Sequence, residues 1–312
     1  MSSARGEFRF VVDDASFGLE DVDGSNLEVL LDSLADQLQL ARERQETTGI
    51  VSGFERFECQ PGVELHQLLT GDGVSRDCRN RIFGLLDKCG RLDANPDFYV
   101  EPRVEVNGLE VESYAIATIL AAQRDAVAVG ALSLVSQYGP GIVSAADGSG
   151  DGHAVVVAGP ESRVAFYRWM YSTEDVGERR FFELALLAFP QIKFADGVTF
   201  RRFEGSYAEL RERTVHHLGR INDSFRASYI AHLGLSDEVS AAMKLDISME
   251  SRKTRSSERL MSERDASYRG RTYRCEWHSK IEPNRNRIHL HPGDERSEEC
   301  VVVGCFVDHL PT

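Results

Sequence analysis

The 312-residue sequence predicts an α+β protein: a mixed amino-terminal region followed by a small antiparallel β-meander domain. Three observations predict this class. A capping box, Ser25-Asn-Leu-Glu28, begins a helix that carries leucines at helical spacing. Asn107-Gly108, flanked by alternating valines, is a strong hairpin signal. Three short runs of strand composition, separated by turn residues, end the chain.

Strands, hairpins and helices alternate in the first part of the mixed region. Alternating or continuous apolar runs indicate the strands, and apolar residues three and four apart indicate the helices. The expected elements are, in order, a strand at 8–12, the helix from Ser25, one or two strands at 48–59, a helix at 75–89, a hairpin at 104–111, a buried helix and strand at 114–135, and strands at 141–144 and 154–157 joined by a surface loop.

The second half of the mixed region is mainly helical. We expect a helix at 174–189, a short strand or two at 191–203, a long helix capped by Ser206 and Glu209, and a helix from Ser236 to about Met249. Residues 250–270 have little apolar content and are typical of a linker or an exposed helix. We therefore expect a sensing, regulatory or scaffold region at 1–249, with a subdivision near residue 172, and an effector domain at 250–312.

Composition limits the class of protein. The net charge of −14 argues against a protein that coats nucleic acid indiscriminately. Residues 251–290, however, carry eleven Lys and Arg against five Asp and Glu, which is compatible with one phosphate-facing site. No apolar run reaches the roughly 18 residues that span a bilayer, and the start of the chain has no apolar signal segment, so we expect a cytoplasmic protein without a membrane partner.

The meander is where the sequence suggests chemistry. Side chains alternate between the two faces of a strand, so Cys275 and Trp277 are expected on one face and Glu276 and His278 on the other. If the apolar faces pack on a core, one polar surface remains exposed, formed by Glu276, His278, Lys280, Arg287, His289 and His291.

This surface has the residue types that metal-independent RNA cleavage requires, namely a base, an acid and cations that hold the phosphate. Histidine titrates near neutral pH, and Arg and Lys bind phosphate. The expected catalytic residues are His278, His289, His291 and Glu276; the expected RNA-binding residues are Lys280, Arg285 and Arg287 on phosphate and Trp277 and Tyr273 stacked on bases. The mechanism requires no cofactor.

The same residues resemble those of a known family. A basic meander that ends in His309-Leu-Pro-Thr resembles the carboxyl-terminal half of RelE/ParE-like toxins. The order His278-x-Lys280, Arg287-Ile-His289, a strand with Gly304, and His309-Leu310 is also similar to the ends of uncharacterised bacterial antiviral-defence proteins. The resemblance covers about 60 of the 312 residues. It implies a bacterial defence or toxin-type protein that acts on messenger RNA in or near the ribosome, with a protein partner or inhibitor.

Three alternatives stay open. Cys275, His278, His289 and His291 have spacings that would suit a structural zinc module. A metal-dependent nuclease would use Asp13, Asp14 and Glu20, but no strand nearby carries the lysine that such sites need. A non-catalytic binding or assembly subunit of a defence complex would spread the polar residues over a flat face and expose Phe306, Val307 and Leu310, whereas an enzyme would gather His278, Lys280, Arg287 and His289 in a partly open cleft.

Overall fold

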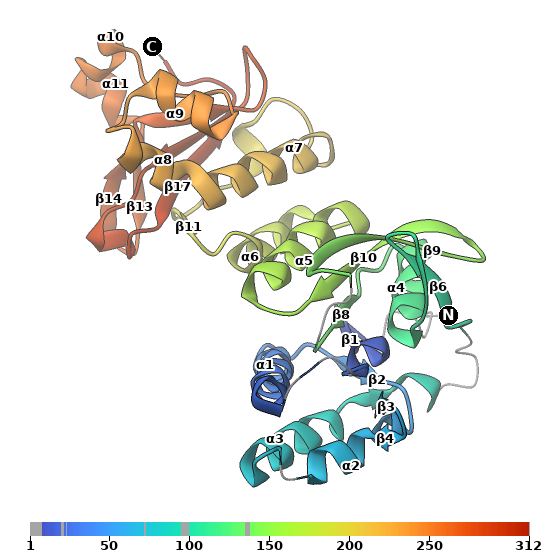
Figure 1. The fold of residues 1–312 in the computed structure, drawn as a ribbon. Coiled ribbons are helices and arrows are strands. Elements are labelled where there is room, and N and C mark those ends of the chain that lie inside the picture. Colours follow the sequence, from blue (N-terminus) through green and yellow to red (C-terminus); the bar gives the residue numbers. More distant parts are fainter. Residues whose placement is uncertain are drawn as a thin grey trace. The chain divides into compact units, whose positions relative to one another are not determined.

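The computed structural model describes residues 8–19, 22, 24–71, 73–94, 100–134 and 138–311 (Figure 1). The protein is α+β, as predicted. Its chain forms two compact units, Met1–Asp175 and Val176–Thr312. The division lies close to the subdivision expected near residue 172. It differs from the boundary expected after residue 249, because strands from both sides of that position pair in one sheet of the second unit.

The first unit is built on an eight-stranded sheet in the order β5-β2-β1-β8-β10-β9-β6-β7. Its strands β5, β2, β1, β8 and β10 are parallel, and β9, β6 and β7 continue the sheet antiparallel. Their bounds are β1 (Phe10–Val12), β2 (Thr48–Ile50), β5 (Gly90–Arg91), β6 (Arg103–Val106), β7 (Leu109–Glu112), β8 (Gly130–Leu132), β9 (Gly141–Asp147) and β10 (Gly150–Val157).

Continuous apolar runs explain the centre of this sheet. Every residue of β1 and β8 is buried, as parallel strands covered on both faces require. The helices of the unit are α1 (Gly24–Glu43), α2 (Leu65–Thr70), α3 (Arg76–Leu86), α4 (Tyr114–Arg124) and α5 (Pro160–Thr173), and a small hairpin joins β3 (Glu58–Gln60) and β4 (Val63–Glu64). The expected hairpin at Asn107-Gly108 is confirmed between β6 and β7, whereas helix α5 was not anticipated.

The second unit contains the predicted meander within a larger sheet. Its strand order is β11-β17-β16-β15-β12, in which β15, β16 and β17 are consecutive antiparallel strands. The strands are β11 (Ile192–Phe194), β12 (Ile247–Met249), β15 (Trp277–Lys280), β16 (Arg287–His291) and β17 (Val301–Val307), and a separate hairpin joins β13 (Asp265–Tyr268) and β14 (Arg271–Arg274).

The helices of the second unit begin at sequence signals and end where the backbone turns. Ser206 and Glu209 form the predicted capping box. The helix that begins at Ser236 ends at Met243, because Lys244 adopts a left-handed conformation (φ +51°), and residues 247–249 form β12 instead of the predicted helical end. The helices are α6 (Glu178–Ala188), α7 (Tyr207–Arg220), α8 (Arg226–Ala231), α9 (Ser236–Met243), α10 (Arg252–Arg255) and α11 (Glu258–Ser262), with a π-helical turn, η6 (Ile221–Phe225), between α7 and α8.

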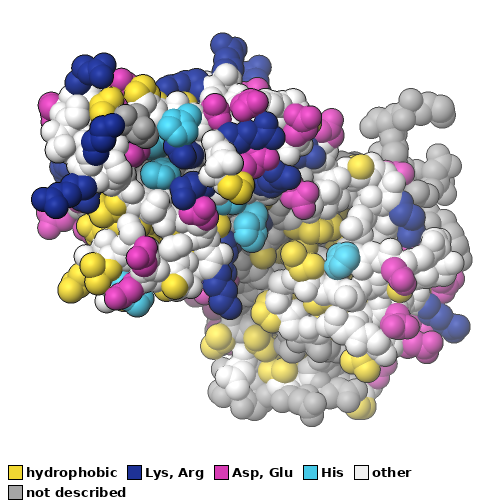
Figure 2. Space-filling model, turned by 90° about the horizontal axis from the view of Figure 1, so that it is seen from above, with side chains coloured by type: hydrophobic (Ala, Val, Ile, Leu, Met, Phe, Trp, Pro, Cys, Tyr) yellow, Lys and Arg dark blue, Asp and Glu magenta, His cyan; other side chains and the backbone are white. Residues whose placement is uncertain are grey.

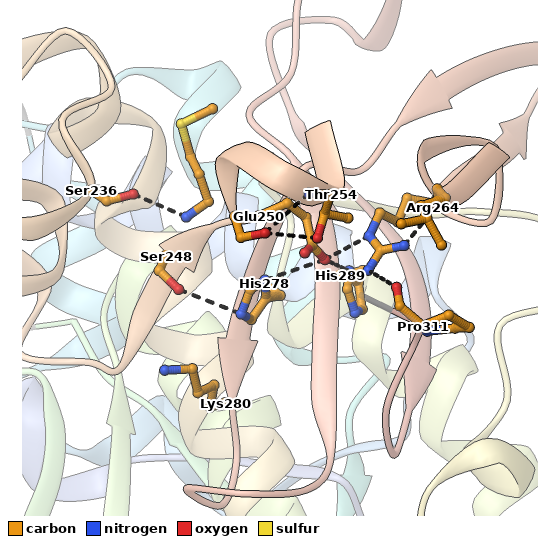
Figure 3. A network of polar contacts seen from close by, with 12 residues as sticks. Ser236, Ser248, Glu250, Thr254, Arg264, His278, Lys280, His289 and Pro311 are labelled. Atoms are coloured by element: carbon orange, nitrogen blue, oxygen red, sulfur yellow. Dashed lines mark hydrogen bonds and ion pairs between the residues drawn. The ribbon is translucent and has the colours of Figure 1, made fainter. Parts of the chain in front are cut away.

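Each face of the second sheet is covered. The Trp277 ring packs on Phe225 and Tyr229, so η6 and α8 cover the face to which Trp277 belongs. The opposite face lies under the segment that contains α10 and α11 (Figure 3). Gly304 allows a close approach on that side, because a Cβ atom there would lie 2.4 Å from the Sγ atom of Cys275. Five short 3-10 helices complete the described fold: η2 (Asp14–Phe17), η3 (Phe54–Arg56), η4 (Leu92–Ala94), η5 (Phe200–Arg202) and η7 (Glu295–Ser297).

Candidate functional site

A row of polar side chains crosses the sheet of the second unit. In the strand register, Ser248 of β12 lies opposite His278 of β15, His278 opposite His289 of β16, and His289 opposite Cys305 of β17. Residues directly opposite on neighbouring strands point to the same face. The four side chains therefore share one face, and the imidazole rings of His278 and His289 lie 5.4 Å apart.

Glu250 adds a carboxylate to this row. It lies two residues after Ser248, just beyond the end of β12, and two residues along an extended chain return to the same face. Its Oε1 atom is 3.7 Å from Nδ1 of His278 and 3.8 Å from Nδ1 of His289. We call Glu250, His278 and His289 the Glu-His-His cluster; Figure 3 shows the two rings rising from their strands toward the carboxylate.

Arg264 holds the carboxylate of Glu250 in place. Its Nε atom donates to Oε1 of Glu250 at 2.6 Å, and its remaining nitrogens donate to the carbonyl oxygens of Leu260 (2.7 Å) and Pro311 (3.0 Å). The Arg264 side chain is almost fully buried. A buried guanidinium with all three groups bonded is rigid, so Glu250 has a fixed orientation above the sheet.

The expected exposed polar surface is wrong for the two histidines of this cluster. His278 is 7% exposed and His289 is 1% exposed, because residues 250–264 fold over them. Thr254, Leu260 and Met261 are buried and anchor that segment. The low apolar content of 250–270 suggested a linker, yet a few buried side chains suffice to fix two short helices on a sheet.

Burial also changes the chemistry of the rings. Burial is the main cause that lowers the pKa of His278 to about 4. The negative charge of Glu250 raises this pKa, whereas the positive charges of Arg287 and Lys280 lower it further. Burial lowers the pKa of His289 well below its usual value as well. Burial therefore disfavours the protonated form that a general acid of RNA cleavage would require in both rings.

Several nitrogen atoms of this face lack partners. Within the described ranges, eight buried side-chain nitrogen or oxygen atoms have no hydrogen-bond partner, and four of them belong to His278, His289 and Arg287: Nδ1 of His278, both ring nitrogens of His289 and Nε of Arg287. Buried polar groups are nearly always bonded, so such a concentration marks a place where a partner is missing.

The cations expected to hold phosphate are engaged elsewhere. Nζ of Lys280 lies 3.0 Å from Oδ1 of Asp246, and Nε of Arg285 lies 2.5 Å from Oε2 of Glu282. Arg287 lies opposite Lys280 in the register and is half-buried. Lys280 and Arg287 are therefore close to the cluster, but Lys280 and Arg285 already have carboxylate partners.

The rings expected to stack on bases are inaccessible. Trp277 and Tyr273 are both buried, Trp277 against the helices on the opposite face of the sheet. His291 is half-buried, and its Nδ1 accepts a hydrogen bond from the backbone N–H of Gly293. Glu276 is half-buried just before β15. The structure does not bring these four residues into one open site.

The zinc set expected from the sequence is not assembled as predicted. Among the described residues, the ligand atoms of Glu250, His278 and His289 lie within 4.8 Å of one another, a group that includes neither Cys275 nor His291. Cys275 lies between β14 and β15 in a buried position against Gly304.

The acidic residues of the first unit are also engaged. The carboxylate of Asp13 accepts hydrogen bonds from the hydroxyls of Ser113 and Ser133, and that of Asp14 accepts from the backbone N–H groups of Tyr114 and Ala115. Glu20, the third residue of the nuclease hypothesis, lies outside the described residues.

The sequence predicted an open cleft for an enzyme and a flat exposed face for an interaction surface, and the structure shows neither arrangement. The His, Lys and Arg residues do gather on two neighbouring strands, but the histidines are covered and form no open cleft. Phe306, Val307 and Leu310, which an interaction surface would expose, are buried.

Sequence reasoning missed Glu250, Arg264 and Ser248. The spacing of Ser248 and Glu250 is that of one strand face, but the helix predicted through residue 249 concealed it. Arg264 carried no signal at all, since its role depends on the fold of α10 and α11.

Comparisons with known proteins leave the site to be interpreted from its own geometry. No protein-family model, curated protein or solved structure matches the chain. No helix in the described part of the chain combines the length and apolar character needed to cross a membrane.

Proposed function

We propose that the second unit binds RNA through cationic side chains on α10, α11 and β14. The surface consists of Arg252, Lys253, Arg255, Arg259 and Arg271, which we call the basic surface; all five are exposed. All five residues lie within the segment of local positive charge that the sequence already indicated, before the strands β15, β16 and β17 of the meander.

One observation supports this proposal: these five cations are not neutralised. Among the described residues, no carboxylate forms an ion pair with any of them. By contrast, Arg213, Arg269, Arg274 and Arg285 of the same unit each pair with a glutamate, as do many cations of the chain. In Figure 2, some Lys and Arg side chains lie among Asp and Glu side chains, and others lie at a distance from them.

Unpaired cations favour a polyanion for a physical reason. Each phosphate that they neutralise releases a condensed counterion, which gives binding that weakens steeply with salt. The overall charge of −14 opposes indiscriminate binding, so a local basic surface in an acidic chain would select where the nucleic acid lies. The proposal does not extend to cleavage, because His278 and His289 are buried.

The test is fluorescence anisotropy of a labelled single-stranded RNA with the full chain, over a range of salt concentrations. We expect Arg252→Ala, Lys253→Ala and Arg255→Ala in combination to reduce the salt slope by about 2, since each lost phosphate contact on a single strand contributes about 0.7. The matched control combines Arg81→Ala, Arg103→Ala and Arg124→Ala, which removes the same charge from ion-paired residues of the first unit.

An equal reduction of the salt slope in both triple variants would show that only net charge matters and would overturn the proposal. The absence of RNA binding at low salt would overturn it as well. A DNA of the same length and heparin serve as competitors. Binding that heparin or DNA removes as readily as RNA would assign the surface to polyanions in general and contradict RNA as its partner.

A further inference from the structure

We infer that Glu250, His278 and His289 form a binding site for one divalent transition-metal ion of the zinc class. The inference is independent of RNA binding, because it rests on different residues. Two histidines and one carboxylate are a ligand set that zinc and neighbouring first-row metals accept.

The spacing of the ligand atoms fits such an ion. Zinc binds histidine nitrogen and carboxylate oxygen at about 2.0–2.2 Å, so tetrahedral ligands lie roughly 3.3 Å apart. The Nδ1 atoms of His278 and His289 lie 3.7 and 3.8 Å from Oε1 of Glu250. All three ligand atoms lie within 4.8 Å of one another, so the side chains would have to move closer together to bind a metal; the 3.7 and 3.8 Å distances are too long for direct hydrogen bonds.

The residues around the cluster already orient it as a metal site requires. Nε2 of His278 lies 3.4 Å from the hydroxyl of Ser248. If Nε2–H donates to that oxygen, the lone pair of Nδ1 is directed toward Glu250. Two acceptors that face each other repel unless a cation lies between them. Arg264 fixes the carboxylate by a hydrogen bond to Oε1, the same atom that faces the two rings, so this oxygen would serve both Arg264 and the ion.

The missing partners are an independent observation that points to a ligand. His289 is 1% exposed, and no hydrogen bond of normal geometry reaches its ring nitrogens or Nδ1 of His278; only the backbone of Cys275 lies near enough to the His289 ring to interact with it. A buried polar group without a partner costs about 1–3 kcal/mol, so a chain that leaves such atoms together gains by binding an ion there. A metal ion would satisfy one nitrogen of each ring.

Charge sets the expected strength of binding. The Glu250–Arg264 pair is neutral as a whole, so a divalent ion would leave two positive charges that only a fourth ligand, such as hydroxide or a small anion, could reduce. We therefore expect weaker binding than in structural zinc sites made of thiolates. No cysteine is needed: Cys305 lies beside His289 in the register, but its sulfur does not join the group of converging ligand atoms.

A second acidic cluster, in the first unit, lacks these features. Glu28, Asp32 and Cys78 also lie close together, but Arg81 pairs with Asp32 at 3.1 Å, and the hydroxyl of Ser75 bonds to Glu28. Both carboxylates thus have partners, and this cluster provides a comparison site of similar composition that we do not expect to bind zinc.

Metal binding would have a structural consequence for the segment above the sheet. Glu250 directly precedes Ser251, whose hydroxyl caps α10, and Arg264 follows α11. An ion held between Glu250 and two strands would tie this segment to the sheet. The segment carries four residues of the basic surface, so its order would then depend on metal.

The test is a titration of the full chain, freed of metal by chelator dialysis, with Zn²⁺ against a competing indicator dye. We expect one equivalent of zinc per chain. His289→Ala and Glu250→Gln should each weaken binding about 100-fold or more, and Ser248→Ala about 10-fold, because it removes only a supporting contact. Gln at position 250 keeps a hydrogen-bond acceptor for Arg264, so this variant retains the fold more readily than Glu250→Ala. The control His216→Ala removes an exposed histidine of α7 and should leave affinity unchanged.

Co²⁺ in place of Zn²⁺ identifies the ligand type by absorption. Nitrogen and oxygen ligands predict weak visible bands without the intense charge-transfer band of a thiolate. No saturable zinc binding by the wild type would overturn the inference. Unchanged zinc affinity in folded Glu250→Gln and Ser248→Ala would also overturn it. A thiolate charge-transfer band would overturn it too, because it would assign the site to the cysteines.

Discussion

Each unit of this protein buries a small group of titratable side chains, and the two groups differ in how their polar atoms are satisfied. In the first unit, both Asp13 and Asp14 follow β1 and receive hydrogen bonds from Ser113, Ser133 and the first N–H groups of α4. In the second unit, Glu250 is bonded to Arg264, but the facing nitrogens of His278 and His289 are not bonded.

The difference teaches how to distinguish a structural polar cluster from a ligand site. Burial alone does not separate them, because Asp13 is as inaccessible as His289. The two clusters differ instead in whether their polar atoms are hydrogen-bonded. Donors surround the aspartates and complete them, whereas the Glu-His-His cluster brings lone pairs together with nothing between them. The first cluster holds a helix end against a strand; the second is complete only with an added cation.

The largest expected contrast is in the pH dependence of the two units. Burial and the neighbouring charge of Asp14 raise the pKa of Asp13 to about 7. An acid with a raised pKa in the folded state stabilises the fold below its unfolded pKa, and this stability is lost as the pH rises from about 4 through 7. The loss in the first unit should be on the order of 4 kcal/mol.

The second unit should respond in the opposite direction. Burial and the charge of His216 lower the pKa of His217 to about 4. The folded state excludes the protonated form, so stability present above pH 6.5 is lost as the pH falls toward 4, by about 3 kcal/mol.

Hydrogen exchange followed by mass spectrometry measures both units in one sample. Asp13→Asn should flatten the slope of peptides from the first unit, and His217→Asn the slope of peptides from the second. His216→Asn, at an exposed neighbour, is the control. Parallel slopes in the two units, or slopes that neither substitution changes, would contradict this account.

Removing Glu250 should be the most costly single substitution in the second unit. Glu250→Ala leaves the buried guanidinium of Arg264 without its carboxylate, and breaking a buried pair in this way costs about 3–5 kcal/mol. Denaturant unfolding measures the loss. Glu258→Ala, which breaks an ion pair from a 77%-exposed carboxylate to Arg274, should cost much less; similar losses for both would show that Glu250 is not a buried partner.

Zinc should stabilise one unit and not the other. An ion that binds only the folded state at 100 times its dissociation constant adds about 2.7 kcal/mol. We expect slower hydrogen exchange in peptides from 247–291 on addition of zinc, and unchanged exchange around Asp13. Protection that appears equally in both units would point to nonspecific binding.

The smallest effects are expected from substitutions that remove single polar groups. Ser113→Ala removes a cap of α4 and a donor to Asp13, which should cost about 1–2 kcal/mol. In metal-free protein, His289→Phe should cost less than about 1 kcal/mol or stabilise, because it removes two nitrogens that have no partner. Thermal unfolding in chelator compares them; a large loss from His289→Phe would mean that the ring is already satisfied.

Local signals predicted much of the fold. The capping box at Ser206, the Asn107-Gly108 turn and the three strands of the meander each depend on residues close in sequence. The parallel arrangement of β1, β8 and β10 could not be predicted from single segments. Paired residues of β1 and β8 are 120 positions apart and those of β8 and β10 are 25 apart, and the apolar runs are too short to specify a register.

The site was predicted in part for the same reason. Strand alternation correctly placed His278 and His289 on one face, and the register confirms it. Alternation carries no information on what covers that face. Residues 250–264 are largely polar, and their burial depends on Thr254, Leu260 and Met261 meeting the sheet, a long-range contact without a local pattern. The prediction that His278 and His289 are exposed failed at this step, whereas RNA cleavage stays a prediction.

The most direct test of the central claim is X-ray absorption at the zinc edge on the full chain loaded with one equivalent of zinc. The account predicts a shell of nitrogen and oxygen at about 2.0 Å, with the outer scattering of two imidazole rings and no sulfur. Glu250→Gln should lose the bound metal. A sulfur shell at about 2.3 Å, the scattering of one ring or none, or a chain that holds no zinc would contradict it.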